Sequence, residues 1–158
     1  MNLRFRRRPD SAYLLIMRLA LFLALLATPL HAWEFTANPV CTLTHTAKSI
    51  EVTVTYDPRQ AEAYAIAVTQ PAPWPAAPVF SIHFDGPRGL TISTARHRLS
   101  NDNATLTVSD TGFGNVLNGL EFNATATAVL GDTEVPVSLE GAAPAVREFR
   151  ACSEGGLV

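Results

Sequence analysis

Cysteine is scarce in this chain, which has only Cys41 and Cys152 among its 158 residues. The two do not form a CxxC pair, so neither a thioredoxin-type redox motif nor a structural zinc site is supported. The sequence also lacks the GxSxG turn of many hydrolases and the HxH or HExxH spacing of zinc sites. Motifs therefore predict no catalytic residue, no metal ligand and no cofactor.

Positive charge is scarce after residue 32. Residues 33–158 hold seven basic and 13 acidic residues, a net charge of −6. Phosphate contacts need clustered Lys and Arg side chains, so nucleic acid is not an expected partner. The same balance argues against binding to an anionic membrane surface.

One apolar run stands out near the start of the chain. Arg18 precedes nine consecutive apolar residues, 19–27, which are too few to cross a bilayer core of roughly 30 Å as a helix. Pro29 then ends the run, and Ala32 offers a small residue for cleavage. This pattern predicts a signal peptide over residues 1–32 and a periplasmic or secreted protein that touches the membrane only through that signal.

Two alternatives remain open for this segment. Residues 1–16 contain four arginines and form either a long basic leader or an upstream extension, in which case Met17 is the true first residue. The apolar run could also stay attached as an uncleaved anchor. Cleavage after Ala32 would make Trp33 the mature N-terminus.

The remaining residues, 33–158, have the length of one domain. In an exported protein, an even number of cysteines indicates a disulfide, so we predict a bond between Cys41 and Cys152. The alternative is two separate buried thiols.

Short alternating segments dominate this domain. In IEVTVTY, residues 50–56, apolar residues alternate with Glu and Thr, as in a half-buried strand. We predict eight such strands, at residues 40–46, 50–56, 64–69, 79–84, 90–94, 105–109, 121–130 and 135–139. The pattern is typical of a mainly β domain, either a β-sandwich or an open barrel of about seven or eight short strands.

Helical spacing appears at two places. Residues 115–120 predict one or two helical turns, and residues 141–152 predict a short C-terminal helix with Phe149 and Cys152 on its inner stripe. The predicted disulfide would then fasten this helix to the first strand of the domain.

The segment PAPWPAAP, residues 71–78, cannot pair in a sheet because proline has no N–H to donate. Trp74 at its centre is the best candidate for an interaction residue. Two interpretations are open: Trp74 anchors a partner, or it folds back as a lid on the sandwich edge.

Three histidines follow residue 32, and two of them suggest a rival function. His83 and Asp85 share the outer face of one predicted strand, and His97 lies just beyond the next. Together they could form a surface cluster in a small metal-binding protein or hydrolase. Ordinary solvated strand residues are the alternative.

The closing segment EVPVSLEGAAPAVREFRAC is a predicted strand that runs into a helix ending in Cys152. Over residues 110–152 it resembles small periplasmic proteins of the invasion-associated locus B family. It differs in having two cysteines, and residues 79–109 have no matching counterpart. The resemblance implies a periplasmic β-rich domain without established catalytic residues.

The leading hypothesis is a non-enzymatic periplasmic domain that binds a protein or another envelope component, through a sheet face or through the Trp74 loop. The rival is the metal-binding protein or hydrolase that uses His83, Asp85 and His97. A purely structural envelope protein is a third interpretation.

Overall fold

The computed structural model describes residues 33–155. The predicted signal peptide, the alternative start at Met17 and the alternative anchor all lie outside these residues. Neither helix in the described part has the length and hydropathy needed to cross a membrane.

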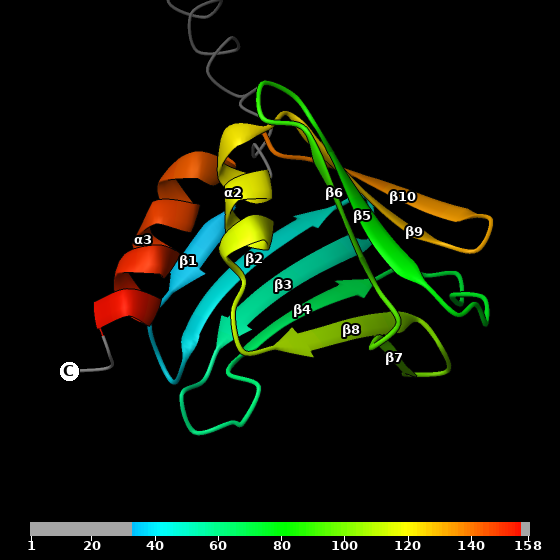
Figure 1. The fold of residues 1–158 in the computed structure, drawn as a ribbon, viewed down its shortest axis with the longest axis horizontal. Helices are drawn as coiled ribbons and strands as arrows, with labels where there is room; N and C mark the ends of the chain where they lie inside the picture. The colour runs from blue at the N-terminus through cyan, green and yellow to red at the C-terminus, as the bar shows by residue number, and fades with distance from the viewer. Residues whose placement is uncertain (1–32, 156–158) are drawn as a thin grey trace, which may run out of the picture. The chain divides into compact units, whose positions relative to one another are not determined.

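Within residues 33–155, the chain forms ten strands and two helices (Figure 1). The strands are β1 (Glu34–Thr36), β2 (Cys41–Ala47), β3 (Ile50–Tyr56), β4 (Tyr64–Thr69), β5 (Phe80–Asp85), β6 (Leu90–Thr94), β7 (Arg98–Ser100), β8 (Thr105–Asp110), β9 (Thr125–Leu130) and β10 (Thr133–Ser138). The helices are α2 (Gly114–Phe122) and α3 (Ala142–Gly155).

The strands form two antiparallel sheets, which confirms the mainly β, sandwich-like prediction. The larger sheet has the order β1-β2-β3-β4-β8-β7, and the smaller has the order β10-β9-β5-β6. Neither order closes on itself, so the fold is an open sandwich and not a barrel. The strand count is ten where seven or eight were expected, because the three-residue strands β1 and β7 are too short to show an alternating pattern.

Alternation decides which residues enter the core. In β3, Val52 and Val54 are buried while Glu51 faces solvent, and in β5, Phe80, Ile82 and Phe84 are buried while His83 and Asp85 are exposed. The buried faces of the two sheets form one continuous apolar cluster. Burial of these side chains is the main driving force for joining the sheets.

The two helices lie side by side (Figure 1). Helix α3 contacts β1 and β2 of the larger sheet, while α2 contacts β6 and β9 of the smaller one. Glu121 of α2 joins the helices, because its carboxylate accepts hydrogen bonds of 3.1 Å from both Arg147 and Arg150 of α3. The Glu121 side chain is only 9% exposed, so these bonds are partly shielded from water.

The predicted strand at residues 121–130 is wrong over its first four positions. Helix α2 continues to Phe122, and β9 begins only at Thr125. The Phe122 ring packs under the Arg88 guanidinium, 4.1 Å from the ring centroid. Asn123 then ends the helix, and its side-chain amide donates to the carbonyl of Gly119 at 3.0 Å. The alternation of Phe122 and Ala124 suits a strand. Helix α2 nevertheless continues to Phe122, because Val116, Leu117 and Leu120 form a buried stripe at helical spacing.

Candidate functional site

A cleft of about 460 Å³ lies between the two sheets, where β6 approaches β8 and where α2 begins. Most of its wall is apolar and is contributed by both sheets and by α2. The apolar lining residues are Ile66, Phe80, Ile82, Ile92, Val108, Phe113 and Val116. All except Ile92 are buried, so the cleft reaches well into the core.

The two sheets supply this wall through their alternation. Ile66 and Val108 face inward from neighbouring strands of the larger sheet and are directly paired in register. Ile82 and Ile92 form the equivalent pair in the smaller sheet. The cleft therefore lies between two facing pairs of branched apolar side chains.

Polar groups gather at the mouth of the cleft, where β6 and β8 end and α2 begins. The polar lining residues are Ser93, Thr94, Arg96, Asp110 and Asn115. The guanidinium of Arg96 pairs with the carboxylate of Asp110, and it also lies 3.7 Å from a carboxylate oxygen of Glu62. The mouth is thus polar while the depth is apolar, an arrangement that suits a molecule with one polar and one apolar end.

The surroundings of Asp110 favour its ionised form. The backbone N–H of Thr111 donates to its carboxylate at 2.7 Å, and this bond, together with the charge of Arg96, lowers the pKa of Asp110. The backbone N–H of Arg96 donates to the hydroxyl of Thr94 at 3.1 Å. The Asp110 carboxylate is therefore oriented by its own turn, and the backbone of Arg96 is held by the end of β6.

Helix α2 presents its first turn to the mouth. Its first helical hydrogen bond runs from the N–H of Leu117 to the carbonyl of Phe113, at 2.8 Å. The N–H groups of the three preceding residues consequently have no partner within the helix, and no side chain caps them. Gly114, Asn115 and Val116 all line the cleft, so these donors lie close to the polar rim.

Trp74 does not offer an exposed anchor. Its ring is 1% exposed, and its indole N–H donates to the carbonyl of Val68 at 3.2 Å. The ring also meets Phe80 edge to face, with centroids 6.4 Å apart. The anchor interpretation is therefore wrong and the lid interpretation agrees with the burial. Because Trp74 packs against Phe80 and Phe80 lines the cleft, the proline-rich segment supports this part of the cleft wall.

The predicted cluster of His83, Asp85 and His97 is also wrong. His83 lies on the outer face of β5, where its ring shares a 3.0 Å hydrogen bond with the hydroxyl of Thr91. His97 is half-buried and lies beside Phe80, which points the opposite way from His83. Among residues 33–155, no group of three or more His, Cys, Asp or Glu side chains could hold a metal ion.

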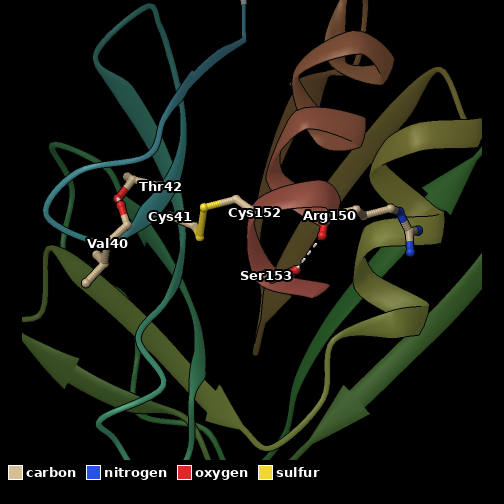
Figure 2. The surroundings of a disulfide bond; sticks show 6 residues. All are labelled: Val40, Cys41, Thr42, Arg150, Cys152 and Ser153. Atoms are coloured by element: carbon tan, nitrogen blue, oxygen red, sulfur yellow. Dashed lines mark hydrogen bonds between the residues drawn. A yellow bond between two sulfur atoms is a disulfide. The ribbon is translucent and has the colours of Figure 1, made fainter. Parts of the chain in front are cut away.

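Cys41 and Cys152 form the predicted disulfide, which joins β2 to α3 (Figure 2). The bond spans 111 positions of the sequence. Since α3 is held to α2 through Glu121, the disulfide also restrains the helix that borders the cleft. Arg150 adds a bond of 2.7 Å to the side-chain oxygen of Asn118 on α2.

The cleft was not found from the sequence. Its lining residues come from four strands, one helix and the loops that follow β6 and β8, and in the sequence its apolar residues look like ordinary core positions. The charged residues of its mouth give little local signal, because Arg96, in the loop after β6, and Asp110, at the end of β8, lie 14 positions apart and match no motif.

Comparisons with protein-family models, curated proteins and solved structures find no match to this chain. The geometry of the cleft is consequently the basis for any functional conclusion.

Proposed function

We propose that this protein is an exported, non-enzymatic binding protein that takes the apolar part of a small amphipathic molecule of the cell envelope into the cleft. One observation carries the proposal: a cleft of about 460 Å³ has buried apolar walls and a polar rim at one end. Ligand sites in proteins typically have volumes of roughly 300–1,000 Å³, apolar walls and a few placed polar groups.

The charged groups at the mouth favour binding over catalysis. Arg96 and Asp110 neutralise each other, and Glu62 lies next to the same guanidinium. A mutual ion pair orients a polar head group through hydrogen bonds, whereas catalysis by these groups would need one of them free to transfer a proton or activate a nucleophile.

Export is the second part of the proposal. A disulfide between distant segments persists in oxidising compartments such as the bacterial periplasm and the extracellular space. The apolar run at residues 19–27 supplies the expected signal. The proposed resemblance of residues 110–152 to the periplasmic invasion-associated locus B family is compatible with this location.

Isothermal titration of the purified exported protein with straight-chain primary alcohols, from hexanol to dodecanol, tests the binding function. We expect saturable binding that strengthens with chain length, because each additional buried methylene contributes about 0.8 kcal/mol. The heat capacity change should be negative, as apolar burial requires.

Two substitutions on one strand provide the matched comparison. Ile92 lines the cleft, so Ile92→Trp should narrow it and weaken binding. Thr91 is exposed on the opposite face of the same strand, so Thr91→Trp should leave binding intact. The proposal fails if the wild-type protein binds no alcohol of the series, or if Ile92→Trp binds as well as Thr91→Trp.

A further inference from the structure

A second, smaller cavity of about 20 Å³ is lined entirely by buried residues of the sandwich. Its walls are apolar and come from both sheets and from α2, including Val52, Leu120, Ala126 and Ala128. The two alanines of β9 face inward where larger side chains would fill the space. This inner cavity is therefore a consequence of small residues at the centre of the smaller sheet.

Two side chains separate the inner cavity from the cleft. Ile66 and Ile82 are the residues that line both spaces. They come from opposite sheets, Ile66 from β4 and Ile82 from β5, and both are buried.

Strand register supports this placement. In the smaller sheet, Ile82 pairs with Ile92 on one side and with Ala128 on the other. Ile92 lines only the cleft, and Ala128 lines only the inner cavity. The order across the sheet is thus cleft, then Ile82, then inner cavity. In the larger sheet Val108 of β8 pairs with Ile66 of β4, and Val68, the next inward-facing residue of β4, pairs with Val52 of β3. Val108 lines only the cleft, whereas Val68 and Val52 line only the inner cavity, so the order is the same.

We infer that Ile66 and Ile82 form the floor of the binding cleft and set the maximum length of the unbranched apolar chain that it accepts. This inference rests on the proposed binding function and assigns its specificity to two residues. A chain that enters past the polar rim runs between the sheets until it reaches these two side chains. Removing one of them joins the cleft to the inner cavity and lengthens the space available to the chain.

The expected effect follows from the free energy of burying a methylene group. In the wild-type protein, affinity for straight-chain primary alcohols should rise about fourfold per methylene and then level off where the chain end meets the floor. In Ile82→Ala the rise should continue to longer chains, so an alcohol beyond the wild-type limit should bind about fourfold tighter for each further methylene it buries. Ile66→Ala should shift the limit in the same direction.

Two controls separate removal of the floor from general loosening of the core. Val52→Ala enlarges the inner cavity from its far side and leaves the floor in place, so its chain-length limit should match the wild type. Adding Ala128→Val to Ile82→Ala refills the inner cavity directly across the strand pair, so the limit should shorten again.

The experiment is isothermal titration of each variant with the alcohol series, with the fold of each checked by near-ultraviolet circular dichroism. Ile82→Val removes a single carbon and provides a variant that retains the fold should Ile82→Ala unfold; it should shift the limit in the same direction by a smaller step. An unchanged limit in the folded Ile82 variants, or an equal shift in Val52→Ala, would overturn the inference while leaving the binding function standing. Absence of alcohol binding by the wild-type protein would instead overturn the proposed function itself.

Discussion

Replacing Trp74 by alanine tests whether the proline-rich segment is a lid. The ring is 1% exposed and is among the largest fully buried side chains of the described residues. Truncation of a buried Trp to Ala typically costs about 3–5 kcal/mol, because apolar burial is lost and a cavity remains. For a domain of this size, such a loss lowers the melting temperature by on the order of 10–20 °C.

The assay is differential scanning calorimetry of the oxidised protein, paired with urea unfolding to obtain the free energy of unfolding. Trp74→Phe separates the two contributions of the ring. It keeps an aromatic side chain near Phe80 but removes the indole N–H that bonds the carbonyl of Val68. Leaving that buried carbonyl without this donor should cost roughly 1–3 kcal/mol, less than the alanine variant.

Val79 provides the matched control. It follows the same proline-rich segment and is 48% exposed. Val79→Ala should therefore change the free energy of unfolding by no more than about 0.5 kcal/mol. The reasoning is refuted if Trp74→Ala melts within a few degrees of the wild-type protein and has the same urea midpoint, because a ring that packs in the core cannot be removed without cost.

Three further predictions concern stability. Replacing Cys41 and Cys152 together by serine should lower the free energy of unfolding in urea by up to about 5 kcal/mol, because the bond closes a loop of 111 positions in the unfolded chain; an unchanged urea midpoint would contradict this. Gly119→Ala should destabilise the domain by about 1–2 kcal/mol in the same assay, because the added Cβ would lie 2.5 Å from the Phe84 ring and overpacking exceeds the helix-propensity gain of about 1 kcal/mol; a stabilised variant would show that the ring moves aside freely. Hydrogen bonds from the side chain and backbone of Arg59 lower the pKa of Asp57 to about 2. The ionised form of Asp57 therefore stabilises the fold above pH about 4, and this contribution disappears as the pH falls through about 2. Asp57→Asn should therefore flatten the pH dependence of the melting temperature between these values, and an identical slope would show that the same pairing survives in the unfolded chain.

The sequence alone determined the local structure of most of this domain. The strands at Ile50–Tyr56, Tyr64–Thr69 and Leu90–Thr94 have the predicted bounds, because period-two alternation is a property of neighbouring residues. The C-terminal helix and the Cys41–Cys152 pairing were also predicted, the latter because two cysteines allow only one intramolecular bond.

Only the tertiary structure decided how these elements meet. The division into two sheets follows from long-range pairing, such as β4 with β8, which no local pattern encodes. Trp74 had two open interpretations in the sequence, and the choice depended on whether Val68 and Phe80 would surround the ring. The same holds for His83 and His97, which lie on opposite sides of β5 although they are near in sequence.

The cleft is determined entirely by the tertiary structure. Ile66 and Ile82 are ordinary inward-facing strand residues in the sequence, and they become the floor of a cleft only because β4 and β5 face each other from different sheets. Arg96 and Asp110 likewise become neighbours because the loop after β6 lies beside the end of β8. Alternation specifies which side of a strand is apolar, whereas the space left between two apolar faces depends on the volumes of residues that are distant in the chain.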